Sequence, residues 1–120
     1  MSTKSIPLWI IRVLAALLLI LGVVVWPGNA DGLIVPHIAL GVVFVLTLFV
    51  VEYQAFRAGV SPTLVALAVV WSLALPVLGL TQGMLPDSLA MIGQVFHLIL
   101  GVGAWLLAET LVRRMPSKKR

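Results

Sequence analysis

The two histidines of this chain occupy matching positions. His37 and His97 lie sixty residues apart, and each is followed four residues later by a glycine, Gly41 or Gly101. Imidazole is the commonest metal-ligating side chain in proteins. The sequence has no cysteine, which excludes disulfides, thiolate metal sites, cysteine nucleophiles and covalent c-type haem attachment. Chemistry in this chain therefore depends on the histidines, on the four acidic residues or on a bound cofactor.

The composition is that of a membrane protein. Of the 120 residues, 62% are hydrophobic and 10% are charged, and the mean hydropathy is +1.19. Too little polar surface remains to cover a water-soluble globule. Four apolar segments have the length of roughly 20 residues that an α-helix needs to cross the hydrocarbon core of a bilayer. We expect these spans at 6–26, 33–53, 62–82 and 88–113.

The connections between the spans are short and rich in glycine, proline, asparagine and aspartate, which are typical of turns. Short connections make consecutive helices antiparallel neighbours. The sequence therefore predicts an all-α, up-down-up-down four-helix bundle that forms a single domain over residues 1–120. The first apolar run, Leu8 to Trp26, is longer than that of a typical signal peptide and lacks a small-residue cleavage site before Pro27, so we expect a retained span.

The positive charges predict the orientation of the bundle. All eight lysines and arginines lie towards the N-terminus, near the second loop or towards the C-terminus, whereas the first and third loops carry only Asp31 and Asp87. Since positive charge remains on the cytoplasmic side, we expect both termini in the cytoplasm and a multi-pass protein of the bacterial inner membrane. The basic tail at 114–120 is expected to meet anionic lipid headgroups, and no nucleic-acid partner is indicated because topology explains the charge.

This topology brings the two histidines together. The second and fourth helices run in the same direction and lie diagonally across a simple bundle, so His37 and His97 face each other if both point to the axis. His37 precedes Glu52 by fifteen residues and His97 precedes Arg113 by sixteen, which places both about 23 Å from the cytoplasmic ends, in the outer half of the membrane. Two neutral imidazoles facing each other in an apolar bundle are the usual axial ligands of b-type haem.

Small residues near the histidines favour a flat cofactor. Gly41 and Gly101 lie one turn beyond each histidine on the same helix face, where a missing side chain leaves space for a porphyrin edge. Gly22 and Gly79 are expected at the same depth on the first and third helices. The same glycines equally suit close packing of transmembrane helices. The residues thus predict one haem b per chain, with the two histidines as iron ligands.

The motif His37-Ile-Ala-Leu-Gly41, at the outer start of the second of four spans, resembles the bacterial cytochrome b561-like membrane cytochromes. Members of that family ligate an outer haem with histidines from helices two and four, and an inner haem with histidines from helices one and four. The resemblance implies that His37 and His97 are the outer pair. The first span has no histidine and the fourth has no second one, which leaves a single-haem variant.

The resemblance also implies electron exchange with quinol or with a redox partner protein, so we expect an electron-transfer protein rather than a stand-alone enzyme. No arginine lies on the outer side to pair with the haem propionates. Asn29, Thr81, Gln82, helix N-termini and water are the partners that remain.

Two acidic residues lie towards the cytoplasmic ends of the spans. Glu109 could form an ion pair with Arg113 one turn away or with Arg12 across the bundle. Glu52 is expected at the cytoplasmic rim, as part of a solvated loop end or of a quinone headgroup site.

Two other classes of function stay open. A cofactor-free structural or assembly subunit would use the apolar faces to join a larger membrane complex. A small transporter or channel fits the length, but four-helix drug exporters depend on an acidic residue in the middle of the first helix, which this chain lacks, and small fluoride channels have balanced charges. We expect self-association into a homo-oligomer or assembly with a partner, because thin helices leave small-residue surface to pack.

Overall fold

The computed structural model describes residues 5–28 and 31–117, and these form four long helices. The helices are α1 (Ser5–Val25), α2 (Ile34–Arg57), α3 (Pro62–Thr81) and α4 (Asp87–Arg114). Two short 3₁₀ turns, η1 (Asp31–Leu33) and η2 (Gln82–Met84), precede α2 and follow α3. The described residues contain no strand, and all four helices are long and apolar enough to cross a membrane. The predicted all-α, four-span bundle is therefore confirmed.

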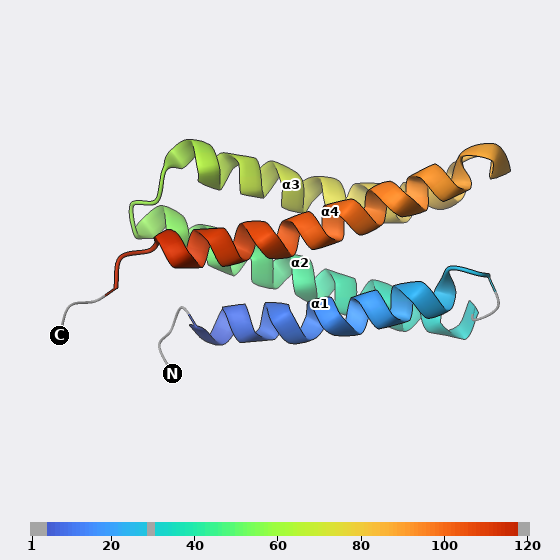
Figure 1. Ribbon diagram of the computed structural model, residues 1–120, viewed down its shortest axis with the longest axis horizontal. Helices are drawn as coiled ribbons and strands as arrows, with labels where there is room; N and C mark the ends of the chain where they lie inside the picture. The colour runs from blue at the N-terminus through green and yellow to red at the C-terminus, as the bar shows by residue number, and fades with distance from the viewer. Residues whose placement is uncertain (1–4, 29–30, 118–120) are drawn as a thin grey trace.

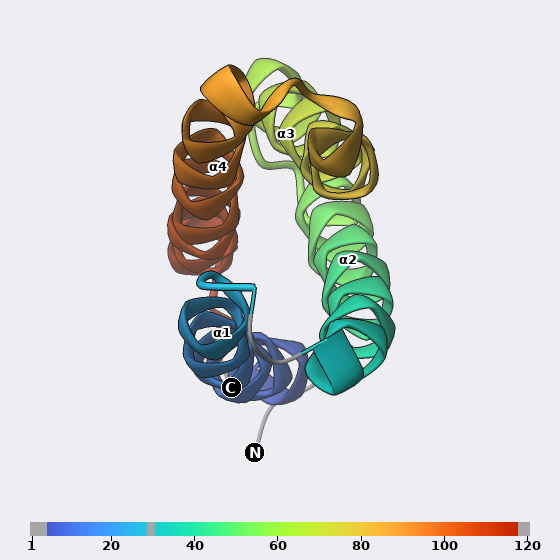
Figure 2. The ribbon, with the colours of Figure 1, turned by 90° about the vertical axis from the view of Figure 1, so that its right-hand side faces the viewer.

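The bundle consists of two helical hairpins that lie side by side (Figure 1). The first hairpin is α1–α2 and the second is α3–α4, and both α1 and α3 contact both α2 and α4. Within the described chain, α2 and α4 also touch each other across the bundle, whereas α1 and α3 do not. The end-on view shows the four helices around a central gap (Figure 2). This up-down-up-down arrangement puts the start of α1 and the end of α4 at the same end of the molecule.

Glycine and proline set the turn between the hairpins. Gly59 has a φ of 79°, in the left-handed region where a residue without Cβ is favoured. The backbone N–H of Gly59 donates to the carbonyl of Phe56 at 3.1 Å, which ends α2. Pro62 then begins α3, where the missing N–H costs nothing because the first turn of a helix leaves it unpaired. The two hairpins are thereby held in close register.

The apolar core fills only one half of the bundle. We call the half that contains the start of α1 and the end of α4 the terminal half, and the half that contains the α1–α2 and α3–α4 connections the open half. The most deeply buried side chains of the terminal half include Ile11, Val51, Ala55, Ala68, Ala108 and Leu111. Towards the open half the two hairpins diverge (Figure 1). Packing of the terminal half therefore holds the hairpins together while leaving space between them beyond it.

The two hairpins bury equivalent positions. The buried residues Phe44, Leu48, Val51 and Ala55 of the first hairpin recur sixty residues later as Ala104, Ala108, Leu111 and Met115. The first helices of the hairpins show the same repeat, with a sequence spacing three residues shorter than that of the second helices. The buried residues that correspond are Leu8 and Val65, Ile11 and Ala68, and Ala15 and Ser72. The two histidines follow the spacing of the second helices. The hairpins are therefore related by an approximate twofold axis along the bundle.

The outer surface of the bundle is strongly apolar. Large hydrophobic side chains such as Val23, Val35 and Leu80 are between 66% and 72% exposed. Water would make this exposure unfavourable, whereas lipid tails solvate it, and the helices satisfy their own backbone hydrogen bonds. The chain is a multi-pass membrane protein whose helix surfaces suit a lipid bilayer.

Candidate functional site

A cavity of about 510 Å³ lies between the hairpins in the open half of the bundle. All four long helices line it, and its volume falls within the range of roughly 300–1,000 Å³ that is usual for ligand sites. The six residues that the sequence singled out all line this one cavity: His37, His97, Gly22, Gly41, Gly79 and Gly101. Most of the remaining walls are aliphatic, so a bound group would contact mainly apolar side chains.

The imidazole rings of His37 and His97 lie next to each other in the cavity, in an edge-to-face arrangement. Their centroids are 6.3 Å apart and their planes are inclined by 61°. Two imidazole nitrogens bound to opposite sides of one metal ion, each at about 2 Å, put the ring centres roughly 6 Å apart, because each nitrogen lies about 1 Å from its own ring centre. The separation of the rings is therefore the separation that two axial ligands of one iron atom require.

Each imidazole lies beside a glycine of the first helix in its own hairpin. A Cβ placed on Gly79 of α3 would come within 2.7 Å of Cε1 of His97, a distance that real Cβ atoms do not reach. On the other side, a Cβ on Gly22 of α1 would lie 3.6 Å from Cε1 of His37, an ordinary van der Waals contact. Gly79 thus makes room for the ring of His97, and Gly22 permits the matching approach of His37.

The other two glycines, Gly41 and Gly101, do not contact the imidazole rings and border open space instead. A Cβ on Gly41 would meet nothing within 4 Å, and one on Gly101 would meet only Cδ1 of Leu75, at 3.9 Å. Both residues lie one turn beyond a histidine and line the cavity. This is the free space along the histidine faces that a flat ligand needs.

Both histidines keep an unused polar atom. Their Nδ1 atoms are buried, and no group in the described chain completes a hydrogen bond with either one, although the backbone of Leu75 comes close to the ring of His97. Buried polar atoms in proteins almost always have partners. The two rings therefore bring polar atoms into the cavity that no group of the described chain uses.

The metal-ligating side chains that line the cavity are the two histidines. No group of three or more His, Cys, Asp or Glu side chains that could hold a metal ion occurs within residues 5–28 and 31–117. A porphyrin supplies four nitrogen ligands of its own and needs only two axial ligands from the protein. Two neighbouring imidazoles, glycine at the ring contacts and apolar walls meet that need.

The polar groups at the loop end of the cavity are two glutamines. Gln82, predicted as a propionate partner, lines the cavity and has a buried Oε1 without a hydrogen-bond partner. Thr81 is exposed and donates its hydroxyl to the carbonyl of Val77, and Asn29 lies outside the described residues. Gln94 also lines the cavity. The sequence signal for Gln94 was its place three residues before His97, which puts both on one helix face.

In the terminal half, Glu109 pairs with Arg12 across the bundle. Arg12 donates from Nε and Nη2 to the two carboxylate oxygens at 2.6 and 3.0 Å, and Trp105 donates its indole N–H to the same carboxylate at 3.2 Å. Of the two partners considered for Glu109, the structure selects Arg12. The guanidinium also lies over the ring of Trp9, at 5.3 Å from its centroid.

The expected position of Glu52 at the cytoplasmic rim is wrong. Its side chain is only 4% exposed, and the hydroxyl of Ser72 on α3 donates to its Oε1. The reason is that α2 continues through Arg57, four residues beyond the expected end of the span at Tyr53. Glu52 therefore lies more than one turn inside the helix and faces the core.

A comparison of the chain with protein-family models, with curated proteins and with solved structures finds no match. The resemblance to the cytochrome b561-like family therefore rests on the motif at His37 and on the four-span topology.

Proposed function

We propose that this protein is a membrane b-type cytochrome that binds one haem b between His37 of α2 and His97 of α4 and serves electron transfer. The observation that carries the proposal is the 6.3 Å separation of the two ring centroids inside a cavity. Glycines at both ring contacts support it. When bound, haem supplies reversible one-electron chemistry at its iron.

The chain's own residues would set the properties of that iron. The imidazoles of His37 and His97 would hold the haem iron, and a haem held by two histidines would supply electron transfer rather than binding of small molecules. The aliphatic walls from all four helices exclude water and keep the site at low dielectric. The close contact between Gly79 and His97 would help to hold one of the two imidazoles in place.

The position of the cavity decides which partners can exchange electrons with it. The cavity lies in the open half, which the distribution of positive charge assigns to the extracytoplasmic side of a bacterial inner membrane. One haem in one half of the bilayer cannot carry electrons across the whole membrane. The proposed partners are therefore membrane-dissolved quinol and a redox protein on the outer side, and the chain acts alone, as a homo-oligomer or within a larger complex.

The test is an absorption spectrum of the purified protein in detergent, oxidised and then reduced with dithionite, with a pyridine haemochrome assay for stoichiometry. We expect the sharp reduced α-band of a six-coordinate b haem, at about one haem per chain. His37→Ala and His97→Ala should each lose stable haem retention. Met91→Ala, at an exposed residue beyond the cavity, is the matched control and should retain haem.

Two results would contradict the proposal. If both alanine variants held as much haem as the parent, the two histidines would not be the ligands. A parent protein that stays colourless after haem is supplied would favour the cofactor-free assembly subunit, with His37 and His97 as packing residues.

A further inference from the structure

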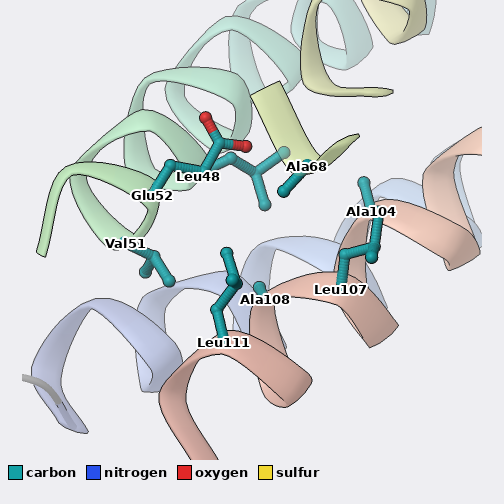
Figure 3. Close-up of a pocket in the computed structure, with 8 residues that line it drawn as sticks. All are labelled: Leu48, Val51, Glu52, Ala68, Ala104, Leu107, Ala108 and Leu111. Carbon is teal, nitrogen blue, oxygen red and sulfur yellow. The ribbon is translucent and has the colours of Figure 1, made fainter. Parts of the chain in front are cut away.

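The core of the terminal half contains one buried carboxyl group that the proposed haem site does not use. Glu52 and Ser72 are 4% and 2% exposed and are the buried polar residues of the described chain. The Ser72 hydroxyl donates to Oε1 of Glu52 at 2.5 Å, which joins α2 to α3. The close-up shows the Glu52 side chain among residues of α2, α3 and α4 (Figure 3).

The surroundings of this carboxyl group are apolar. Its second oxygen, Oε2, is buried and has no hydrogen-bond partner in the described chain. The residues that line the packed interior beside Glu52 are aliphatic: Leu48, Val51, Ala68, Ala104, Leu107, Ala108 and Leu111 (Figure 3). The packed interior here has essentially no space for a water molecule. A negative charge on Glu52 would therefore be solvated by one hydroxyl group alone.

Within residues 5–28 and 31–117, no cation pairs with Glu52 to balance such a charge. On α2 itself, Tyr53 and Arg57 are exposed. The sequence of α3 contains no titratable residue. The basic residue of α1, Arg12, is bound through two hydrogen bonds to Glu109 of α4. The other basic residues of α4, Arg113 and Arg114, belong to its last turn.

Glu52 and Glu109 are thus two carboxyl groups at similar depth with opposite surroundings. Each lies five residues before the end of its helix, about 7.5 Å along the axis. Glu109 accepts hydrogen bonds from a guanidinium and an indole, which stabilise its ionised form. Glu52 has no comparable donors, and burial of an unpaired charge strongly disfavours ionisation. These different environments favour different protonation states, with Glu109 ionised and Glu52 neutral.

We propose that Glu52 and Ser72 form a proton-binding site inside the membrane. Glu52 holds its proton on Oε2 as a neutral carboxylic acid, Oε1 accepts the hydrogen bond from Ser72, and the proton exchanges with water at the nearby end of the bundle. Ionisable groups within transmembrane helices commonly mark such proton sites. The inference does not depend on haem, because it concerns the terminal half and not the cavity in the open half.

Infrared spectroscopy of the full-length protein in lipid tests this proposal directly. At neutral pH, the parent should show the carbonyl band of a protonated carboxylic acid, and transfer to heavy water should shift the band as the proton exchanges. Glu52→Gln should lack the band. Glu109→Gln is the matched control and should keep it, because Glu109 contributes no protonated acid. Ser72→Ala should move the band to higher frequency, since the carbonyl loses its hydrogen bond.

The outcomes separate the two parts of the proposal. A parent protein without the band, or a Glu52→Gln variant that retains it, would overturn the assignment of the proton to Glu52. A band that never shifts in heavy water would overturn exchange. Should Glu52→Gln fail to fold, the frequency shift in folded Ser72→Ala still decides the assignment, because no other carboxyl group accepts a hydrogen bond from Ser72 in the described chain.

Discussion

The imidazole of His97 lies so close to Gly79 that only a residue without a side chain fits there, because a Cβ would approach Cε1 of His97 to 2.7 Å. The two nitrogens of the His97 ring would also be close to this Cβ, with Nδ1 at 3.3 Å and Nε2 at 3.4 Å. Gly79 on α3 therefore determines where the ring of an α4 residue can sit.

Gly79→Ala should weaken haem binding by about tenfold or more, because the added methyl group must displace the His97 ring from its position beside His37, and core overpacking of this kind typically costs about 1–3 kcal/mol. The measurement is a haem titration followed by absorbance. Gly32→Ala is the matched control, since its Cβ would meet nothing within 4 Å and Gly32 does not line the cavity. Equal weakening in both variants would show that the contact at Gly79 has no special role.

The ion pair between Arg12 and Glu109 should stabilise the terminal half of the bundle. Glu109→Ala leaves a guanidinium and the Trp105 indole without their acceptor, so we expect the thermal midpoint in detergent to fall by several degrees. Thr110→Ala is the control, because its exposed hydroxyl bonds only to the carbonyl of Leu106 in its own helix. An unchanged midpoint in Glu109→Ala would mean that Arg12 finds an equally good partner at the lipid surface.

The orientation can be tested because the chain has no native cysteine. A single cysteine at Ser61, in the connection between the hairpins, should be cytoplasmic, and one at Ser88, near the start of α4, should be extracytoplasmic. Both residues are exposed. In intact spheroplasts, a membrane-impermeant maleimide should label Ser88→Cys at once and Ser61→Cys only after permeabilisation. The reverse pattern would place the cavity on the cytoplasmic side.

The architecture was predictable because it depends on properties that a sequence displays directly. Span length, breaker-rich connections and one-sided charge specify four antiparallel helices. Since α2 and α4 share a direction, equal distances from their ends place His37 and His97 at one depth. The structure adds that both line the same cavity and that their rings lie close together, edge to face.

The contacts of individual side chains were less predictable, because these helices are apolar on every side. A helix without an amphipathic stripe does not reveal which face it buries. The sequence placed Gly79 at the right depth but could not show that it touches His97. Glu52 was misplaced for a related reason: the expected end of its span at Tyr53 was four residues short, and a polar residue near a presumed end looks solvated.

Neither hairpin holds a complete site. Each contributes one imidazole from its second helix and one glycine from its first, at positions that recur in the other half. If two copies of one such hairpin lay side by side in the same orientation, each would contribute one imidazole. The two imidazoles would then meet at the twofold axis of the dimer. The chain is thus built like a homodimer whose two subunits have been joined into one polypeptide. The short connection between α2 and α3, which ends at Pro62, ensures that each molecule contains one copy of each hairpin.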